Sequence, residues 1–167
     1  MSTTYDFGSG PVPAHRHLNP DGKLGGWVAD TATVAPTAWV FDYAQVSGNA
    51  RVSGNARVSG DAQVSGFARV YGFARVYGNA WVSGDAKVYG NAWVYGNARV
   101  SGDAQVYGFA QVSGDAQVFD YAKVFGNAQV FDYARVYGFA RVYGFAQVFD
   151  YARVSGDAQV SGESVLV

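Results

Sequence analysis

The sequence predicts an all-β protein, a single-stranded parallel β-solenoid wound from a six-residue repeat. Valine occupies every sixth position from 28 to 160, which is 23 consecutive times, and Leu166 continues the series. Alanine occupies every sixth position from 32 to 158. Glycine or aspartate stands two residues after almost every valine. Together these three observations predict one strand and one corner that repeat along the whole series.

The strand follows from the spacing of alanine and valine. The unit at 50–55 reads Ala-Arg-Val-Ser-Gly-Asn, and in an extended chain its alanine and valine face the same side. The residue between them is mostly Arg, Gln, Lys or Trp, which is typical of a solvated face. We therefore expect four-residue strands that alternate with two-residue corners. A helix cannot keep this pattern, because six residues turn it through about 600° and move the valine stripe around the axis.

The corner is defined by the second residue after each valine. From 30 to 162 this position is glycine 17 times, aspartate five times and Pro36 once. Glycine, and less easily aspartate, tolerates a positive φ, so we expect a left-handed backbone conformation in most corners. The ring of Pro36 forbids that conformation, so its corner must differ.

The number of hexads in a coil is left open by composition, since two would give a flat 12-residue coil and three a triangular 18-residue coil. Residues 25–162 resemble the hexapeptide-repeat family of left-handed parallel β-helices, whose unit has an aliphatic residue followed four positions later by a small one, as at Val52 and Ala56. They depart from that family because glycine comes second after the aliphatic residue rather than first. The Gly-Gly-Trp-Val segment at 25–28 with its Gly-Asn-Ala-Arg-Val units is similar to uncharacterised bacterial and phage-associated YdcK-like repeat proteins.

This resemblance implies a left-handed, three-sided β-helix with 18-residue coils. The handedness comes from the resemblance alone, because the general crossover rule favours the right hand. Residues 28–166 hold 24 hexads and so make 8 coils, a rod about 38 Å long at the usual strand spacing. We expect two parts, an N-terminal cap segment at 1–26 and the repeat domain at 27–167, with residues 12–24 covering the first coil and Trp27 at the junction.

Outward side chains stack in columns on an 18-residue coil, and several columns are aromatic. One holds five consecutive rings, beside a partly basic column: Tyr71, Tyr89, Tyr107, Phe125 and Tyr143. Three further rings are candidates for contacts with a partner or ligand: Phe119, Phe131 and Phe149. Stacked rings can simply stabilise strands, or they can mark a lateral interface or a surface on which glycans stack.

The two ends of the repeat differ. The last residues, Ser164-Val165-Leu166-Val167, are apolar apart from the serine, so the final coil is expected to lack a polar cap. An uncapped coil offers open strand edges, which favours end-to-end association or burial against a partner. Truncation of a longer chain is the other explanation.

Catalytic chemistry has little support in the sequence. There is no cysteine, and the only histidines are His15 and His17, whose spacing places both on one face of a strand without an evident third metal ligand. Acyltransferases and γ-type carbonic anhydrases of the superfamily that the chain resembles use a catalytic histidine or a three-histidine zinc site. Residues 28–167 contain no histidine and no loop insertion. We therefore expect no enzyme and no cofactor, with the two histidines as weak metal candidates.

Charge and hydropathy restrict the partners. The formal net charge of −1 creates no field that would attract nucleic acid or an anionic membrane. Charged residues, Gly or Ser recur every few positions, so no membrane span is expected, and residues 1–10 do not resemble a secretory signal. The expectation is a cytoplasmic protein, with a phage or surface assembly left open.

Three functions remain. We expect a non-catalytic structural or self-assembly scaffold, a homo-oligomer whose aromatic faces make lateral or end-to-end contacts. The alternative is a module that binds a glycan or another extended polymer through its Tyr/Arg ladder. A hexapeptide acyltransferase-like enzyme is disfavoured. The regularity of the repeat would also fit an engineered scaffold.

Overall fold

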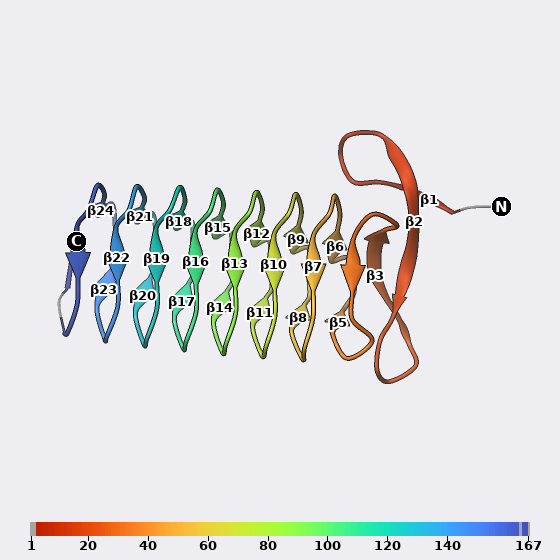
Figure 1. Ribbon diagram of the computed structural model, residues 1–167, viewed down its shortest axis with the longest axis horizontal. Coiled ribbons are helices and arrows are strands. Elements are labelled where there is room, and N and C mark those ends of the chain that lie inside the picture. Colours follow the sequence, from red (N-terminus) through yellow and green to blue (C-terminus); the bar gives the residue numbers. More distant parts are fainter. Residues whose placement is uncertain (1–2, 164, 167) are drawn as a thin grey trace.

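The computed structural model describes residues 3–163 and 165–166, and shows a straight rod of stacked coils with a small antiparallel cap at its N-terminal end (Figure 1). Within those residues every regular element is a strand. Three sheets run along the rod, and paired strands lie 18 residues apart, as in the pairing of Arg69 with Lys87. The predicted parallel β-solenoid with three sides, 18-residue coils and about eight coils is therefore confirmed.

Sheet 1 joins the cap to one side of the rod. Its strands, in spatial order, are β1 (Thr4–Asp6), β2 (Pro11–Leu18), β3 (Leu24–Ala29), β6 (Gln45–Val46), β9 (Gln63–Val64), β12 (Trp81–Val82), β15 (Arg99–Val100), β18 (Gln117–Val118), β21 (Arg135–Val136) and β24 (Arg153–Val154). The pairs β1–β2 and β2–β3 are antiparallel, and all later pairs of this sheet are parallel.

Sheets 2 and 3 form the other two sides and are wholly parallel. Sheet 2 contains β4 (Thr33–Val34), β7 (Arg51–Val52), β10 (Arg69–Val70), β13 (Lys87–Val88), β16 (Gln105–Val106), β19 (Lys123–Val124), β22 (Arg141–Val142) and β25 (Gln159–Val160). Sheet 3 contains β5 (Trp39–Val40), β8 (Arg57–Val58), β11 (Arg75–Val76), β14 (Trp93–Val94), β17 (Gln111–Val112), β20 (Gln129–Val130), β23 (Gln147–Val148) and β26 (Val165–Leu166). The chain visits the three sheets in turn, so each coil contributes one strand to each side.

The strands of the rod are shorter than the four residues expected. Regular pairing covers two residues, because the residues on either side already belong to the corners. At one corner the amide of Ala68 donates to the carbonyl of Ser65 at 3.3 Å, which closes a β-turn over Gly66 and Phe67. Each side of the triangle is only six residues long, so little chain remains between two turns.

The core is a column of valine and alanine along the axis of the rod. From Ala38 to Val148 every alanine and valine of the repeat is fully buried. Burial of a valine side chain stabilises the fold by about 1.5–3 kcal/mol relative to exposure, and the repeat supplies three such residues to each coil. The predicted inward orientation of these residues is confirmed.

Backbone hydrogen bonds hold neighbouring coils together at the sides and at the corners. Within one hexad the amides of Arg69, Tyr71 and Phe73 donate to carbonyls one coil further on, at 2.9, 3.0 and 2.8 Å. The corner is thus paired as regularly as the strand. Residues 18 apart are consequently held directly above one another, which is why outward side chains form straight columns.

The corners adopt the left-handed conformation predicted for most of them. All 17 corner glycines have a positive φ, as do four of the five corner aspartates, Asp42, Asp120, Asp132 and Asp150. Pro36 and Asp30 are the exceptions. The amide of Asp30 instead donates to the carbonyl of Pro13 at 2.9 Å, so pairing with β2 sets the backbone at this corner.

The cap closes the first coil with side chains as well as strands. The side-chain amide of Asn19 donates to the carbonyl of Val40 at 3.1 Å, and its oxygen accepts from the amide of Val40 at 2.9 Å. These bonds satisfy the edge of β5, which has no preceding coil to pair with. The expected boundary at residue 26 falls inside β3, which belongs to both the cap hairpin and sheet 1.

Candidate functional site

The five aromatic residues predicted to stack on sheet 2 form a continuous ladder. We call this set, Tyr71, Tyr89, Tyr107, Phe125 and Tyr143, the five-ring ladder. Neighbouring ring centroids are 4.8–5.0 Å apart and the ring planes differ by 1–6°. The spacing equals the rise of one coil, so the backbone pairing sets it. The predicted stacking is confirmed.

The five-ring ladder is a partly buried strip on the surface of sheet 2. Each ring is half-buried; the three interior rings stack on a neighbour on both sides, whereas Tyr71 and Tyr143 stack on one. Burial raises the pKa of Tyr89, and the neighbouring Tyr107 and Tyr71 raise it further. The hydroxyl of Tyr89 donates to Oε1 of Gln105 on the next coil at 3.5 Å, a long contact. The surface that remains is a strip of four phenol rings and one phenyl ring beside the outward residues of sheet 2.

The other three predicted rings do not join this ladder. Phe119 stacks on Tyr137 on sheet 1, and Phe131 stacks on Phe149 on sheet 3, each pair at 4.9 Å. The triangular cross-section puts these pairs on different sides of the rod. The eight predicted contact residues therefore lie on three surfaces, and their role in contacts remains a prediction.

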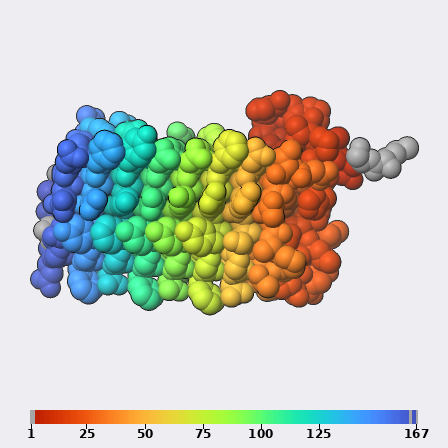
Figure 2. All heavy atoms as spheres, viewed as in Figure 1, coloured from red at the N-terminus to blue at the C-terminus, as the bar shows by residue number. Residues whose placement is uncertain are grey.

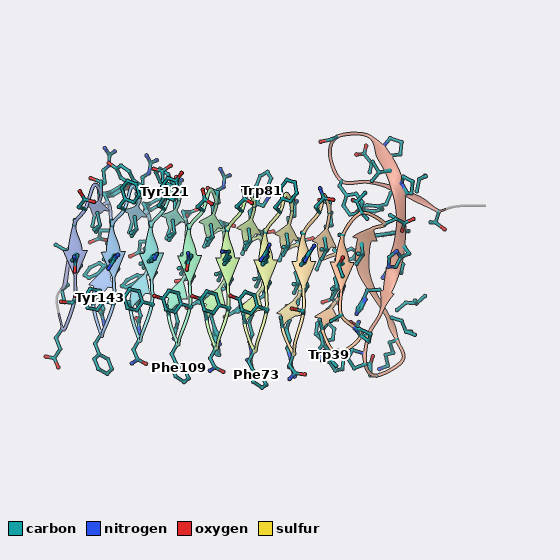
Figure 3. All side chains as sticks on the ribbon, viewed as in Figure 1. Trp39, Phe73, Trp81, Phe109, Tyr121 and Tyr143 are labelled. Carbon is teal, nitrogen blue, oxygen red and sulfur yellow. The ribbon has the colours of Figure 1, made fainter. Side chains whose placement is uncertain are left out.

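A different aromatic column lies along the corner between sheets 2 and 3, and the sequence prediction missed it. Its residues, which we call the Phe/Asn column, are Phe73, Asn91, Phe109, Asn127 and Phe145. The phenylalanines are 59%, 62% and 65% exposed, and Phe73 and Phe109 project from the lower edge of the rod in Figure 3. The alternation of Phe and Asn every 18 residues could have revealed the column once the coil length was known.

The alternation leaves the faces of the phenylalanine rings open. Two phenylalanines of the column are two coils apart, which places them about 10 Å from each other. Each intervening asparagine is shorter and leaves a slot between two rings. In Figure 2 the same edge of the rod carries separate knobs with gaps between them.

A groove of about 600 Å³ follows this column. Its floor and walls are the five column residues together with the outward residues of β11, β14, β17 and β20. Among the lining residues Arg75 is the only charged one, and its guanidinium carbon lies 5.0 Å from the centre of the Trp93 ring. The groove is therefore lined by aromatic and amide side chains, with one cation already engaged by an aromatic face.

The two histidines occupy separate environments in the cap. Nδ1 of His15, which is exposed, lies 2.9 Å from a carboxylate oxygen of Asp30. His17 is buried, and its Nε2 donates to the carbonyl of Ala38 at 3.0 Å. Burial lowers the pKa of His17, with the bond to Ala38 acting in the opposite direction. Across residues 3–163 and 165–166, no group of three His, Cys, Asp or Glu side chains could hold a metal ion.

These features define a class: a capped, three-sided parallel β-solenoid repeat protein with aromatic columns on its surface. A family model described as YdcK Beta solenoid repeat matches several overlapping segments of the rod. The matched residues are 44–60, 50–66, 68–84, 74–90, 86–102 and 92–108. The match supports the predicted similarity to YdcK-like repeat proteins over that part of the chain. A search of curated proteins gives no match. In the part of the chain that the structure describes, there is no helix of the length and apolarity that a membrane crossing needs.

Proposed function

We propose that the protein is a non-catalytic structural scaffold that self-associates laterally through aromatic residues on its surface. The observation that carries the proposal is the Phe/Asn column, whose three phenylalanines are about 60% exposed above a groove lined by aromatic and amide side chains. Large exposed apolar side chains that gather along one edge of a folded protein tend to mark a contact site. A rod whose coils are fixed by backbone bonds can present such residues at regular intervals without reorganising.

The arrangement of the aromatic rings favours self-association over the alternative function, glycan binding by the five-ring ladder and its neighbouring arginines. Sugar rings stack on the faces of aromatic rings, and in the five-ring ladder each interior face is covered by a neighbour at 4.8–5.0 Å. The ladder then acts mainly within the rod, where stacked pairs stabilise adjacent coils. The open ring faces belong to the Phe/Asn column instead.

The proposal also concerns the handedness of the coil and the direction of the contacts. The left-handed winding is supported by the resemblance to the hexapeptide-repeat family, and an experimental structure would test it. End-to-end contacts were expected partly from Ser164 and Val167, which lie outside the described residues, so the proposal depends on lateral contacts alone.

Sedimentation velocity over a wide range of concentration tests the proposal. We expect a reversible species heavier than the 17.8 kDa monomer that increases with concentration. Because the contact is apolar, added salt should not dissociate it. A strict monomer at the highest attainable concentration would contradict self-association, and turnover of an acyl-CoA donor would contradict the non-catalytic part.

A further inference from the structure

We propose that the partner in this self-association is a second, antiparallel copy of the chain, and that the phenylalanines of each Phe/Asn column enter the asparagine slots of the other. This inference rests on the proposed function and names its contact surface. It depends on three properties of the column: the size of its slots, the order of Phe and Asn along it, and the rigidity of the rod.

The slots have the width of one aromatic ring. A ring inserted midway between Phe73 and Phe109 would lie about 5 Å from each, since these residues are two coils apart. That is the distance at which rings stack elsewhere on this rod, 4.8–5.1 Å between centroids. An inserted ring would thus complete a ladder of the kind that the chain builds within itself, with Asn91 at the base of the slot.

The order of residues makes the column complementary to itself. A two-fold axis perpendicular to the rod, placed between the coils of Asn91 and Phe109, brings each phenylalanine of one copy opposite an asparagine of the other. The pairs are Phe109 with Asn91, Phe73 with Asn127, and Phe145 with Asn55. All three phenylalanines of both copies are matched at once, and Glu163, the next residue of the column, faces Thr37.

Symmetry favours the antiparallel arrangement over a parallel one. A parallel copy shifted by one coil would also interdigitate, but the contact is then heterologous, and one of the six phenylalanines faces Glu163 instead of an asparagine. The antiparallel pair is isologous and closed. We therefore expect a dimer rather than a fibre.

The rigidity of the rod allows several rings to engage together. The corner amides of Phe73, Phe109 and Phe145 donate to carbonyls of the next coil at 2.8–2.9 Å. Rings that stack from one coil to the next deviate from parallel by only 1–9° on all three sides of the rod. The column is accordingly straight, and a copy that meets one slot correctly meets the others in register.

Charge does not oppose the pairing. Arg75 is the only charged residue among those that line the groove. In the proposed arrangement the two copies of Arg75 lie three coils apart along the axis, about 15 Å. This exceeds the Debye length of about 8 Å at physiological ionic strength, so their repulsion is screened.

The expected interface is of modest size. A phenylalanine that is about 60% exposed has roughly 120 Å² to bury, given about 200 Å² for the whole residue. Six such rings and the slot walls that they cover would remove on the order of 1,200–1,500 Å² from solvent, at the lower end of specific interfaces. The dimer should therefore form reversibly.

The decisive experiment fills the slots. The double variant Asn91→Phe/Asn127→Phe turns the column into a continuous row of rings, which adds apolar surface and removes the spaces. If the rings interdigitate, sedimentation velocity will show a loss of at least tenfold in dimer affinity. Non-specific hydrophobic association predicts the reverse, a stronger dimer, and that result would overturn the inference.

Two further variants check the order of residues rather than the composition. The triple variant Phe73→Asn/Phe109→Asn/Phe145→Asn should also lose the dimer. Exchanging the two residue types preserves the complementarity about the same two-fold axis, so this register-swapped chain should dimerise like the unchanged protein. Its substitutions are those of the triple variant combined with Asn55→Phe, Asn91→Phe and Asn127→Phe. A register-swapped chain that stays monomeric although circular dichroism shows it folded would count against the inference.

A matched control is Phe67→Asn, since Phe67 has the same place in its hexad and the same 59% exposure as Phe73 but lies on another corner. It should leave the dimer unchanged, whereas Phe109→Asn weakens it. If the unchanged protein dimerises and none of these variants alters its affinity, the inference fails while self-association stands. If the unchanged protein is a monomer, both fail.

Discussion

Replacing a corner glycine by alanine should cost more inside the stack than at its last coil. Gly138 and Gly156 occupy the same corner of adjacent coils, with φ of +69° and +61°. An added Cβ at Gly138 would lie 2.9 Å from the amide nitrogen of Gly156 and 3.3 Å from its carbonyl oxygen. At Gly156 nothing lies within 4 Å. The two sites therefore share the backbone strain and differ in the steric clash.

The two contributions can be estimated separately. An alanine held in the left-handed region lowers the stability of the fold by about 1–2 kcal/mol, and this loss is common to both variants. The clash at Gly138 involves backbone atoms that are fixed by coil-to-coil hydrogen bonds, so it resembles overpacking, which costs about 1–3 kcal/mol more. We expect Gly156→Ala to lower the free energy of unfolding by about 1–2 kcal/mol and Gly138→Ala by about 2–5 kcal/mol.

Urea denaturation followed by circular dichroism measures both losses. Gly84→Ala serves as a further control, because its Cβ would also lie 2.9 Å from a backbone nitrogen, that of Gly102, far from the last coil. It should match Gly138→Ala. Equal losses for Gly138→Ala and Gly156→Ala would refute the reasoning, since strain in φ alone would then explain the use of glycine.

Three further measurements test other parts of the fold. Tyr89→Ser removes two ring contacts at 4.8 Å and should lower the free energy of unfolding by about 1–3 kcal/mol, whereas Tyr71→Ser removes one contact and should lower it by about half as much. Similar losses for the two variants would show that stacking does not stabilise the rod. Burial lowers the pKa of His17 below its ordinary value of 6.5, so the contribution of His17 to stability is complete above that pH and decreases as the pH falls below it. The urea midpoints at about pH 8 and about pH 5 should therefore differ less in His17→Gln than in the unchanged protein, and an equal difference would contradict this. Asp120 has a φ of +58° and accepts a hydrogen bond from the amide of Gly138 at 3.2 Å. Asp120→Ala loses the bond and keeps the strain, so it should cost about 1 kcal/mol, and Asp120→Gly should be more stable than Asp120→Ala because it also relieves the strain. Equal stability of the two variants would show that the positive φ carries no strain.

The local structure of the rod could be predicted because it repeats a local pattern. Alanine and valine two residues apart must share a face of an extended chain, and the structure buries them together. Glycine two residues after valine marks a positive φ, which is a property of one residue and its neighbours. Asp30 departs from the pattern because a distant strand, β2, takes its amide.

The contacts of the cap were less predictable. The bonds from Asn19 to Val40 and from His17 to Ala38 join residues 21 positions apart that belong to different motifs. Nothing in the repeat indicates which side chains will satisfy the first exposed edge. The alternation predicted His15 and His17 on one strand face, but the register of β2 shifts between Arg16 and Leu18, and His15 is exposed whereas His17 is buried.

The sequence by itself determined the repeating unit of this protein, its inward residues and the conformation of its corners. The tertiary structure decided which outward residues are neighbours, because that depends on how many hexads close one coil around the core. With 18 residues to a coil, Tyr71 stacks on Tyr89, and Phe73 stands above Asn91. A 12-residue coil would have produced different columns from the same hexads. The number of hexads in a coil depends on how residues of different hexads pack together, so it cannot be read from any single hexad.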